Sequence, residues 1–212
     1  AMNASQNPQH TALHTQIQNQ QHYFEQTFSQ LNGAQTTLRD VEFEACTFSE
    51  CDFSAARWQN CRFINCHFMR CNLSLLELTG SRLFGMTFVD SKLIGIDWTK
   101  ANWPIYHLDF ELSFQRCLLS DASFFGLTLH ELQMDECRLH DVDFREGDFR
   151  QSVMTHCDFA ASQFMRTNLQ DADLSDSHDF ALNVLENQVT GAKFSRYEAL
   201  ALLECLGIEL VD

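Results

Sequence analysis

The sequence predicts an all-β solenoid, a rod built from stacked coils that each contact only their neighbours. A large apolar residue recurs at every fifth position over most of the chain, and a small residue recurs two positions before it. A period of five fits neither the helical period of 3.6 residues nor the strand period of two. It fits a chain that directs two side chains of every five inward and then turns a corner. The 19 Phe, against three Tyr and three Trp, agree with one recurring buried position.

The large apolar residues keep one phase over residues 38–108 and a phase shifted by one residue over 114–174. Asp179 interrupts the second phase, which then resumes with an apolar residue at Val184, Val189 and Phe194. The shift, near residues 109–113, comes just after Pro104. We expect a kink or a one-residue bulge there, because Pro cannot donate a ladder hydrogen bond.

Many of the five-residue segments share one motif: a small residue, Asp or Asn, Leu or Phe, and two variable residues. The clearest segments begin at Cys51, Cys71, Cys157, Thr167 and Ala172. In this motif the chain resembles the pentapeptide-repeat family over roughly residues 36–194. The resemblance implies a right-handed quadrilateral β-helix with four pentapeptides per coil, stacked about 4.8 Å apart. We expect about seven coils over residues 38–174 and about one more from the irregular ends.

The nine Cys and nine His raise the question of a metal or redox site. Eight of the Cys fall in the small inward position: Cys46, Cys51, Cys61, Cys66, Cys71, Cys117, Cys137 and Cys157. Buried Cys packs as a small apolar residue, and this spacing does not match paired zinc ligands. The His in the repeats fall at outward or corner positions. We therefore expect no metal and no cofactor.

The formal net charge of −15 excludes direct nucleic-acid binding as a main activity, because phosphate contacts need Lys and Arg. Such a field attracts basic surfaces, including those that hold DNA. No apolar run is long enough for a membrane helix, and no secretory signal opens the chain, so we expect a cytoplasmic protein. No catalytic constellation or phosphate-binding loop stands out, so we expect no catalytic residues and no enzyme activity.

The charge is unevenly distributed. Residues 1–108 carry nine acidic and seven basic residues, whereas residues 109–212 carry twenty acidic and seven basic residues. Outward acids belong to the family motif and also discourage edge association, so solubility is the simpler explanation. We favour a partner-binding acidic surface, because solubility does not explain one nearly neutral half. Its candidate residues are Asp121, Glu131, Asp135, Glu136, Asp141, Asp143, Glu146, Asp148, Asp158, Asp171, Asp173 and Asp176.

The ends predict three segments. Residues 1–22 are polar and expected to be largely disordered, residues 23–194 form the β-helix, and residues 195–212 form a helical dimerisation module. Ser195 and Glu198 predict a capping box, and Gly207 predicts the end of the helix. One face of this apolar helix can cover the open coil, and the other needs a partner, most simply in a symmetric dimer. The expected dimer contacts are Tyr197, Leu200, Leu203, Leu206, Ile208 and Leu210.

Further stretches narrow the resemblance to the topoisomerase-interacting branch of the family. Residues 202–210 resemble the dimerisation module of Qnr-type quinolone-resistance proteins, and residues 95–104 and 112–117 are similar to the albicidin-resistance member. The resemblance implies a homodimer that mimics duplex DNA, binds DNA gyrase or topoisomerase IV, and protects the enzyme from, or modulates it against, a poison such as a fluoroquinolone or albicidin. Qnr-type members carry projecting loops, whereas this chain keeps its phase from Leu38 to Leu108 and again from Phe114 onward, which predicts no large loop.

Charge density supports this interpretation. A tail-to-tail dimer would carry about 30 negative charges over about 80 Å, or one per about 2.7 Å. Duplex DNA carries one charge per about 1.7 Å. The alternative is a repeat scaffold with a partner other than gyrase, which predicts no effect of reversing Asp141 or Glu146.

Overall fold

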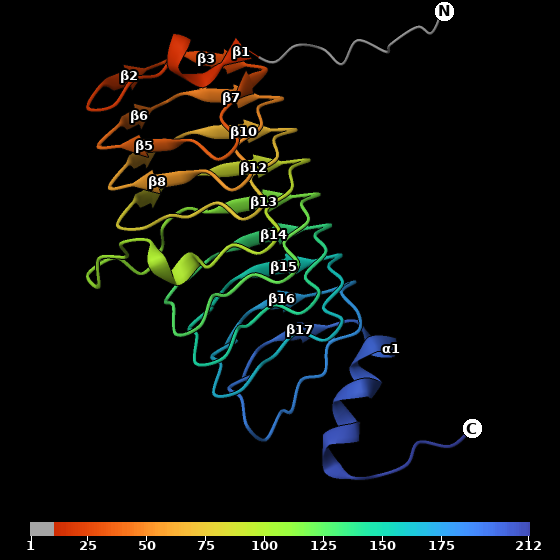
Figure 1. Cartoon of the computed structure of the whole chain (residues 1–212). Helices are drawn as coiled ribbons and strands as arrows, with labels where there is room; N and C mark the ends of the chain where they lie inside the picture. The colour runs from red at the N-terminus through yellow and green to blue at the C-terminus, as the bar shows by residue number, and fades with distance from the viewer. Residues whose placement is uncertain (1–10) are drawn as a thin grey trace, which may run out of the picture.

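The computed structural model describes residues 11–212 and forms a parallel β-solenoid (Figure 1). One nine-stranded sheet runs the length of the rod and contributes one strand to each of nine coils. Its strands are β3 (Thr27–Ser29), β7 (Thr47–Ser49), β10 (His67–Met69), β12 (Thr87–Val89), β13 (Ser113–Gln115), β14 (Gln133–Asp135), β15 (Val153–Thr155), β16 (Asp173–Leu174) and β17 (Lys193–Phe194). The β-helix fold class is thereby confirmed.

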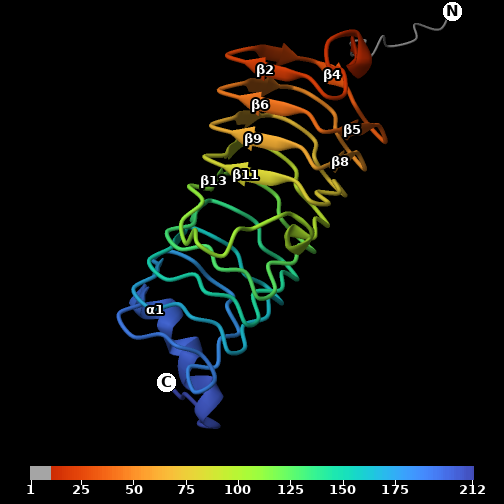
Figure 2. The ribbon, with the colours of Figure 1, turned by 90° about the vertical axis from the view of Figure 1, so that its left-hand side faces the viewer.

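Shorter sheets form the other three faces of the rod. They comprise β2 (His22–Phe24), β6 (Glu42–Glu44), β9 (Arg62–Ile64) and β11 (Arg82–Phe84); β5 (Thr37–Arg39) and β8 (Arg57–Gln59); and β1 (Thr11–Ala12) and β4 (Leu31–Asn32). Figure 2 shows the β2–β6–β9–β11 face stacked in that order. Isolated parallel bridges, such as Asp158 with His178, continue these faces toward the C-terminus.

The corners between faces explain the period of five. Outside the insertion that follows Trp98, the residue two positions after the central apolar residue of a regular repeat adopts a left-handed conformation, with φ of +54° at Glu50 and +56° at Asp141. Its backbone N–H donates to the next coil, as from Asp141 to the carbonyl of Ala160 at 3.0 Å. These hydrogen bonds offset the cost of positive φ in non-glycine residues.

The core consists of the two inward positions of each pentapeptide. Phe rings stack from coil to coil, with centroids 4.5 Å apart for Phe48 and Phe68 and 5.0 Å apart for Phe88 and Phe114. All eight predicted Cys are buried as free thiols, and burial raises the pKa of Cys61 to about 11 and of Cys66 to about 12. These Cys therefore pack as small core residues, as predicted.

The expected one-residue bulge is wrong. Thr87 pairs with Ser113, an offset of 26 residues, whereas every other strand pair of this sheet is offset by 20. Six extra residues therefore enter one coil and project as a loop after the 3₁₀ helix η2 (Trp98–Lys100). The expectation of no large loop is also wrong. Leu108, expected in the core, is 52% exposed, and Phe110 is buried instead.

The solenoid begins earlier than expected. Residues 11–22 form β1, which pairs with β4, and the 3₁₀ helix η1 (Leu13–Thr15). Leu13 and Ile17 are buried and close the first coil. The expected disorder over residues 1–22 therefore does not hold for 11–22, because two apolar side chains suffice to cover the coil end; residues 1–10 lie outside the described residues.

The C-terminal segment is helical, with α1 (Arg196–Ala199) followed by η3 (Leu200–Leu206), and lies at the far end of the rod (Figure 1). The predicted capping box is not formed, since Ser195 Oγ accepts a hydrogen bond from the Asp176 backbone N–H at 2.7 Å instead. Gly207 ends the helix as predicted, with φ of +70°. In residues 11–212, no helix is long and apolar enough to cross a bilayer.

Candidate partner-binding surface

The twelve candidate acids occupy different positions within the repeat. One group sits at left-handed corners, where the side chain leaves the rod: Asp121, Glu131, Glu136, Asp141, Glu146, Asp171 and Asp176. At these positions the backbone turns away from the core, so the carboxylates point to solvent. This corner group forms the outermost acidic surface of the molecule.

A second group of Asp, directly before the central apolar residue, folds back onto the backbone. Asp143 and Asp173 each accept a hydrogen bond from the backbone N–H two residues on, at 2.9 Å in both cases. Asp148 and Asp158 make the same contact at 3.3 and 3.1 Å. Each carboxylate serves as the acceptor for a backbone N–H at the turn that has no backbone carbonyl as its partner. These Asp residues therefore have a structural role.

Arg side chains pair with two members of the second group. The Asp143 carboxylate pairs with Arg145 at 2.9 Å, and Asp148 pairs with Arg150 at 2.7 Å. Burial opposes ionisation of Asp143, but the Arg145 hydrogen bonds outweigh it and lower the pKa of this carboxyl. Asp158 contacts His140 at 2.5 Å. The two Arg pairs therefore reduce the free negative charge of this group.

The corner group keeps more of its charge. Within residues 11–212, no Lys, Arg or His nitrogen lies within 4 Å of the carboxylates of Asp121, Glu136, Asp141 or Asp171. Glu146 and Asp176 are exceptions, since Arg166 contacts Glu146 at 2.8 Å and His156 lies 3.3 Å from Asp176. The available charge is thus carried mainly by four corner residues.

Two more candidates, Asp135 and Asp176, share one imidazole. His156 lies 3.0 Å from Asp135 and 3.3 Å from Asp176, and the hydrogen bond to Asp135, with Asp176 adding its charge, raises the pKa of His156. The last candidate, Glu131, lies against Asp109, and this hydrogen bond raises the pKa of Glu131. Protonation of His156 near neutrality therefore changes the charge of this surface.

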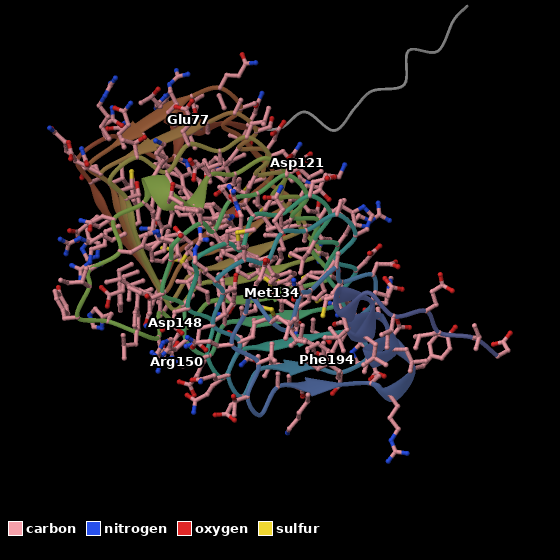
Figure 3. All side chains as sticks on the ribbon, turned by 90° about the horizontal axis from the view of Figure 1, so that it is seen from below. Glu77, Asp121, Met134, Asp148, Arg150 and Phe194 are labelled. Atoms are coloured by element: carbon pink, nitrogen blue, oxygen red, sulfur yellow. The ribbon has the colours of Figure 1, made fainter. Side chains whose placement is uncertain are left out.

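The corner acids run along the edges of the C-terminal half instead of gathering on one face. Residues 20 apart stack, so Asp121 lies over Asp141, and Glu136 lies two coils from Asp176. Viewed along the rod, Asp121 lies on one side of the core residue Met134 and the inner Asp148 on another (Figure 3). Asp148 belongs to the face that ends at the edge of Glu131 and Asp171, so these two corner acids lie on a different edge from Asp121 and Asp141. The negative charge therefore surrounds this half of the rod.

One cluster could accept a cation. Asp158, His178 and Asp179 each place a possible ligand atom within 4.8 Å of the others. His178 already contacts Asp179 at 2.9 Å, and Asp158 is shared with His140. These groups satisfy one another as ion pairs, and the arrangement needs no metal to explain it.

The basic side chains that contact the second group of Asp residues were not predicted from the sequence. A signal was available, because Asp143 and Arg145, like Asp148 and Arg150, flank a central Phe at a spacing of two. Two residues apart in an extended pentapeptide, such side chains leave the same face. The pairing with His140 had no such local signal, since it joins neighbouring coils.

The six predicted dimer residues lie on the surface. Tyr197 is 81% exposed, and Leu200, Leu203, Leu206, Ile208 and Leu210 are exposed as well. Leu202 alone in this segment packs partly against the core. The helix therefore leaves an apolar face without a partner in the single chain.

Each regular coil has four sides of five residues, and each side directs one small and one large residue inward. This arrangement defines a pentapeptide-repeat solenoid. The chain belongs to the pentapeptide-repeat family, since the model for the pentapeptide repeat region matches residues 41–113 and 107–174. No curated protein sequence matches the chain.

Solved structures of QnrB1, a plasmid-mediated fluoroquinolone resistance protein, have a similar fold. One trypsin-treated variant superposes with a TM-score of 0.58 at 20% identity and covers 90% of this chain and 100% of that chain. A second trypsin-treated variant gives 0.57 at 21%, covering 96% and 100%. The full-length protein gives 0.50 at 21%, covering 90% and 99%. At this identity the likeness concerns the fold.

Proposed function

We propose that this protein is a non-catalytic DNA mimic that binds DNA gyrase or topoisomerase IV and protects the enzyme from a poison such as a fluoroquinolone or albicidin. The observation that carries the proposal is the set of unpaired corner acids around the C-terminal half. A rigid rod with regularly spaced outward charges resembles the regular phosphates of a duplex. A basic DNA-binding surface would be attracted to it.

The fold comparison is consistent with this proposal, because QnrB1 is described as a fluoroquinolone resistance protein. The projecting loop adds a second point of likeness, since Qnr-type members also interrupt their repeats with loops. We propose further that two copies join through the exposed C-terminal residues, Tyr197 and Leu200 among them. Such a dimer brings the two acidic halves together at the centre of a longer rod.

One observation favours the alternative of a scaffold with another partner. Asp143, Asp148 and Asp158 are held by backbone, Arg or His contacts, so they are not presented as free charges. A rod with fewer available charges is a poorer imitation of DNA. The two functions therefore need a direct test on the corner group.

The test is a gyrase supercoiling and DNA-cleavage assay with the purified protein, with and without a fluoroquinolone or albicidin. The informative variant replaces Asp121, Asp141 and Asp171 with Asn. Asn tolerates the left-handed conformation, so charge is lost with little backbone cost. We expect the wild type to change drug-induced cleavage at micromolar concentration and the triple variant to need at least about tenfold more protein.

Asp40→Asn is the matched control, because Asp40 also occupies a left-handed corner, with φ of +55°, but lies in the nearly neutral half. It should behave as the wild type. If the wild type has no effect on either enzyme with or without drug, the proposal is wrong and the scaffold function is favoured. If Asp40→Asn loses as much as the triple variant, the effect is not specific to the acidic half.

A further inference from the structure

The projecting loop creates a cleft that none of the preceding functions uses. The loop follows Asn102 and overhangs the β2–β6–β9–β11 face just below β11 (Figure 2). The cleft has a volume of about 320 Å³. Its lining includes Arg62, Arg82 and Phe84 from the strands and Tyr106, His107 and Phe110 from the inserted segment. This volume lies at the lower end of the range typical of small-molecule sites.

The charge of the cleft is opposite to that of the molecule. Two Arg and one His line it, without one Asp or Glu, in a chain whose net charge is −15. Arg62 and Arg82 are register partners on β9 and β11, so two guanidinium groups lie on adjacent strands. Like charges at this spacing repel each other, and an anion between them would relieve the repulsion.

Neither guanidinium is neutralised by a neighbour. In residues 11–212 the arginine ion pairs involve other arginines, such as Arg70 and Arg116. Glu42 on β6 is the register partner of Arg62 on the side away from Arg82, but it does not line the cleft. Arg82 has Arg62 as its neighbour on one side and the loop on the other, so the N–H donors of its guanidinium group remain available to a ligand.

The remaining walls are aromatic. The His107 ring lies 6.1 Å from Phe84, 4.8 Å from Tyr106 and 5.8 Å from Phe110, measured between ring centroids. The half-buried Phe84 on β11 and the strongly exposed Tyr106 on the loop both line the cleft. A flat ring in the cleft would gain contact with these aromatic side chains.

We propose that this cleft binds a small planar aromatic carboxylate. The carboxylate would accept hydrogen bonds from Arg82 and Arg62, a pairing for which the guanidinium geometry is well matched. The ring would lie against Phe84, His107 and Tyr106. A mono- or bicyclic acid suits a volume of about 320 Å³.

The proposal is tested with 2-naphthoate as probe, by isothermal titration calorimetry on the full-length protein. The uncharged 2-naphthylmethanol keeps the ring and removes the carboxylate. We expect saturable binding of one 2-naphthoate per chain and at least about tenfold weaker binding of the alcohol. Chemical-shift changes in an amide NMR spectrum should be confined to residues of β9, β11 and the loop.

Arg82→Gln should weaken 2-naphthoate binding at least about tenfold. The matched control is Arg57→Gln, because Arg57 lies on β8, on another face, and donates to Thr37 at 3.0 Å. It removes the same charge and should change affinity less than about twofold. Circular dichroism verifies that both surface variants remain folded.

Three results would overturn the proposal. They are the absence of saturable 2-naphthoate binding, an equal loss in the Arg57 and Arg82 variants, and shift changes located away from the cleft. The first result would indicate that the cleft receives a side chain of a partner protein instead of a free ligand. None of these measurements involves gyrase, so they are independent of the proposed function.

Discussion

Position within the pentapeptide decides what an acidic residue does. Asp158 precedes the central Phe159, and its carboxylate accepts the Ala160 N–H at 3.1 Å and contacts His140. Asp141 occupies a corner, and its side chain meets no cation within residues 11–212. The same chemical group therefore stabilises the coil at one position and remains available to a partner at the other.

Asp158→Ala is expected to lower the free energy of unfolding by about 1–2 kcal/mol, because a backbone N–H loses its acceptor and His140 loses its partner. The measurement is urea denaturation followed by circular dichroism. Asp141→Asn serves as comparison and should stay within about 0.5 kcal/mol of the wild type. Equal losses in the two variants would contradict the structural role of the inner Asp.

His156 predicts a pH dependence of stability. Asp135 and Asp176 raise the pKa of His156 in the folded state above the ordinary value of about 6.5, and they lie on neighbouring coils. The stabilisation is therefore complete below about pH 6.5 and is lost as the pH rises through the folded-state pKa. Asp135 has a lowered pKa, so it remains ionised throughout this interval.

The thermal unfolding midpoint of the wild type should fall between about pH 6 and about pH 8.5. His156→Asn, which tolerates the left-handed corner at φ +54°, should reduce this fall. His67→Asn is a control at an exposed strand position and should leave the slope unchanged. A slope that is the same in all three proteins would show that His156 does not contribute.

Among the elements, the loop and the C-terminal helix are additions to a regular rod. The loop lies between Asn102 and Leu108. The backbone N–H of Asn102 donates a hydrogen bond to the Ser81 carbonyl, and the carbonyl of Leu108 accepts one from the backbone N–H of His130. Both ends are thus fixed to neighbouring coils, whereas residues 103–107 form no backbone hydrogen bond with a neighbouring coil of the described chain. Ile105, at 96% exposure, is the most exposed apolar residue of the chain that the structure describes.

Deleting residues 104–109 should restore the regular coil. Trp103 would then be followed by Phe110, Glu111 and Leu112, so that Leu112 and Phe114 keep their inward positions at the regular spacing of the repeat. We expect a folded protein whose urea midpoint stays close to that of the wild type, because removal of the loop offsets the loss of one coil hydrogen bond, from the His130 N–H to the Leu108 carbonyl. Loss of cooperative unfolding would show that the loop itself is needed for folding.

The exposed face of the C-terminal segment predicts a dimer. Sedimentation should give twice the chain mass of 24.5 kDa for the wild type and a single chain for a variant with Leu200→Glu and Leu206→Glu. Leu75→Glu is the matched control, since Leu75 is 61% exposed but lies on a coil of the other half. A wild type that sediments as one chain at micromolar concentration would contradict the proposed dimer.

For the whole molecule, the charge asymmetry along the rod is the main property. The N-terminal coils carry nearly equal numbers of acidic and basic residues, whereas the C-terminal edges leave Asp121 and Asp141 unpaired within the described chain. Stacked coils hold these charges at spacings of about 5 Å or its multiples. A partner with a basic channel would therefore meet a rigid rod whose negative electrostatic field is concentrated at its C-terminal half.

Under the proposed function, affinity for gyrase should fall steeply between about 50 and about 300 mM salt, because much of the attraction is electrostatic. The variant with Asn at residues 121, 141 and 171 should bind more weakly at low salt and show a shallower dependence. Surface plasmon resonance measures both. Salt-independent binding by the wild type would argue against DNA mimicry even if the complex forms.

The coil and its core followed from the sequence alone. Five-residue periodicity is a local pattern, and each residue's distance from the central Phe or Leu fixes whether it is buried, as at Phe48 and Cys66. The unequal charge of the two halves is likewise a property of composition along the chain. These features need no knowledge of which coil contacts which.

Tertiary structure decided the rest. A phase defined modulo five cannot distinguish an insertion of one residue from an insertion of six, so the loop became visible only when Thr87 was paired with Ser113. Likewise, the contacts of His140 with Asp158 and of His156 with Asp135 join different coils. Such pairs depend on which side chains the stacking brings together, and linear spacing does not encode that choice by itself.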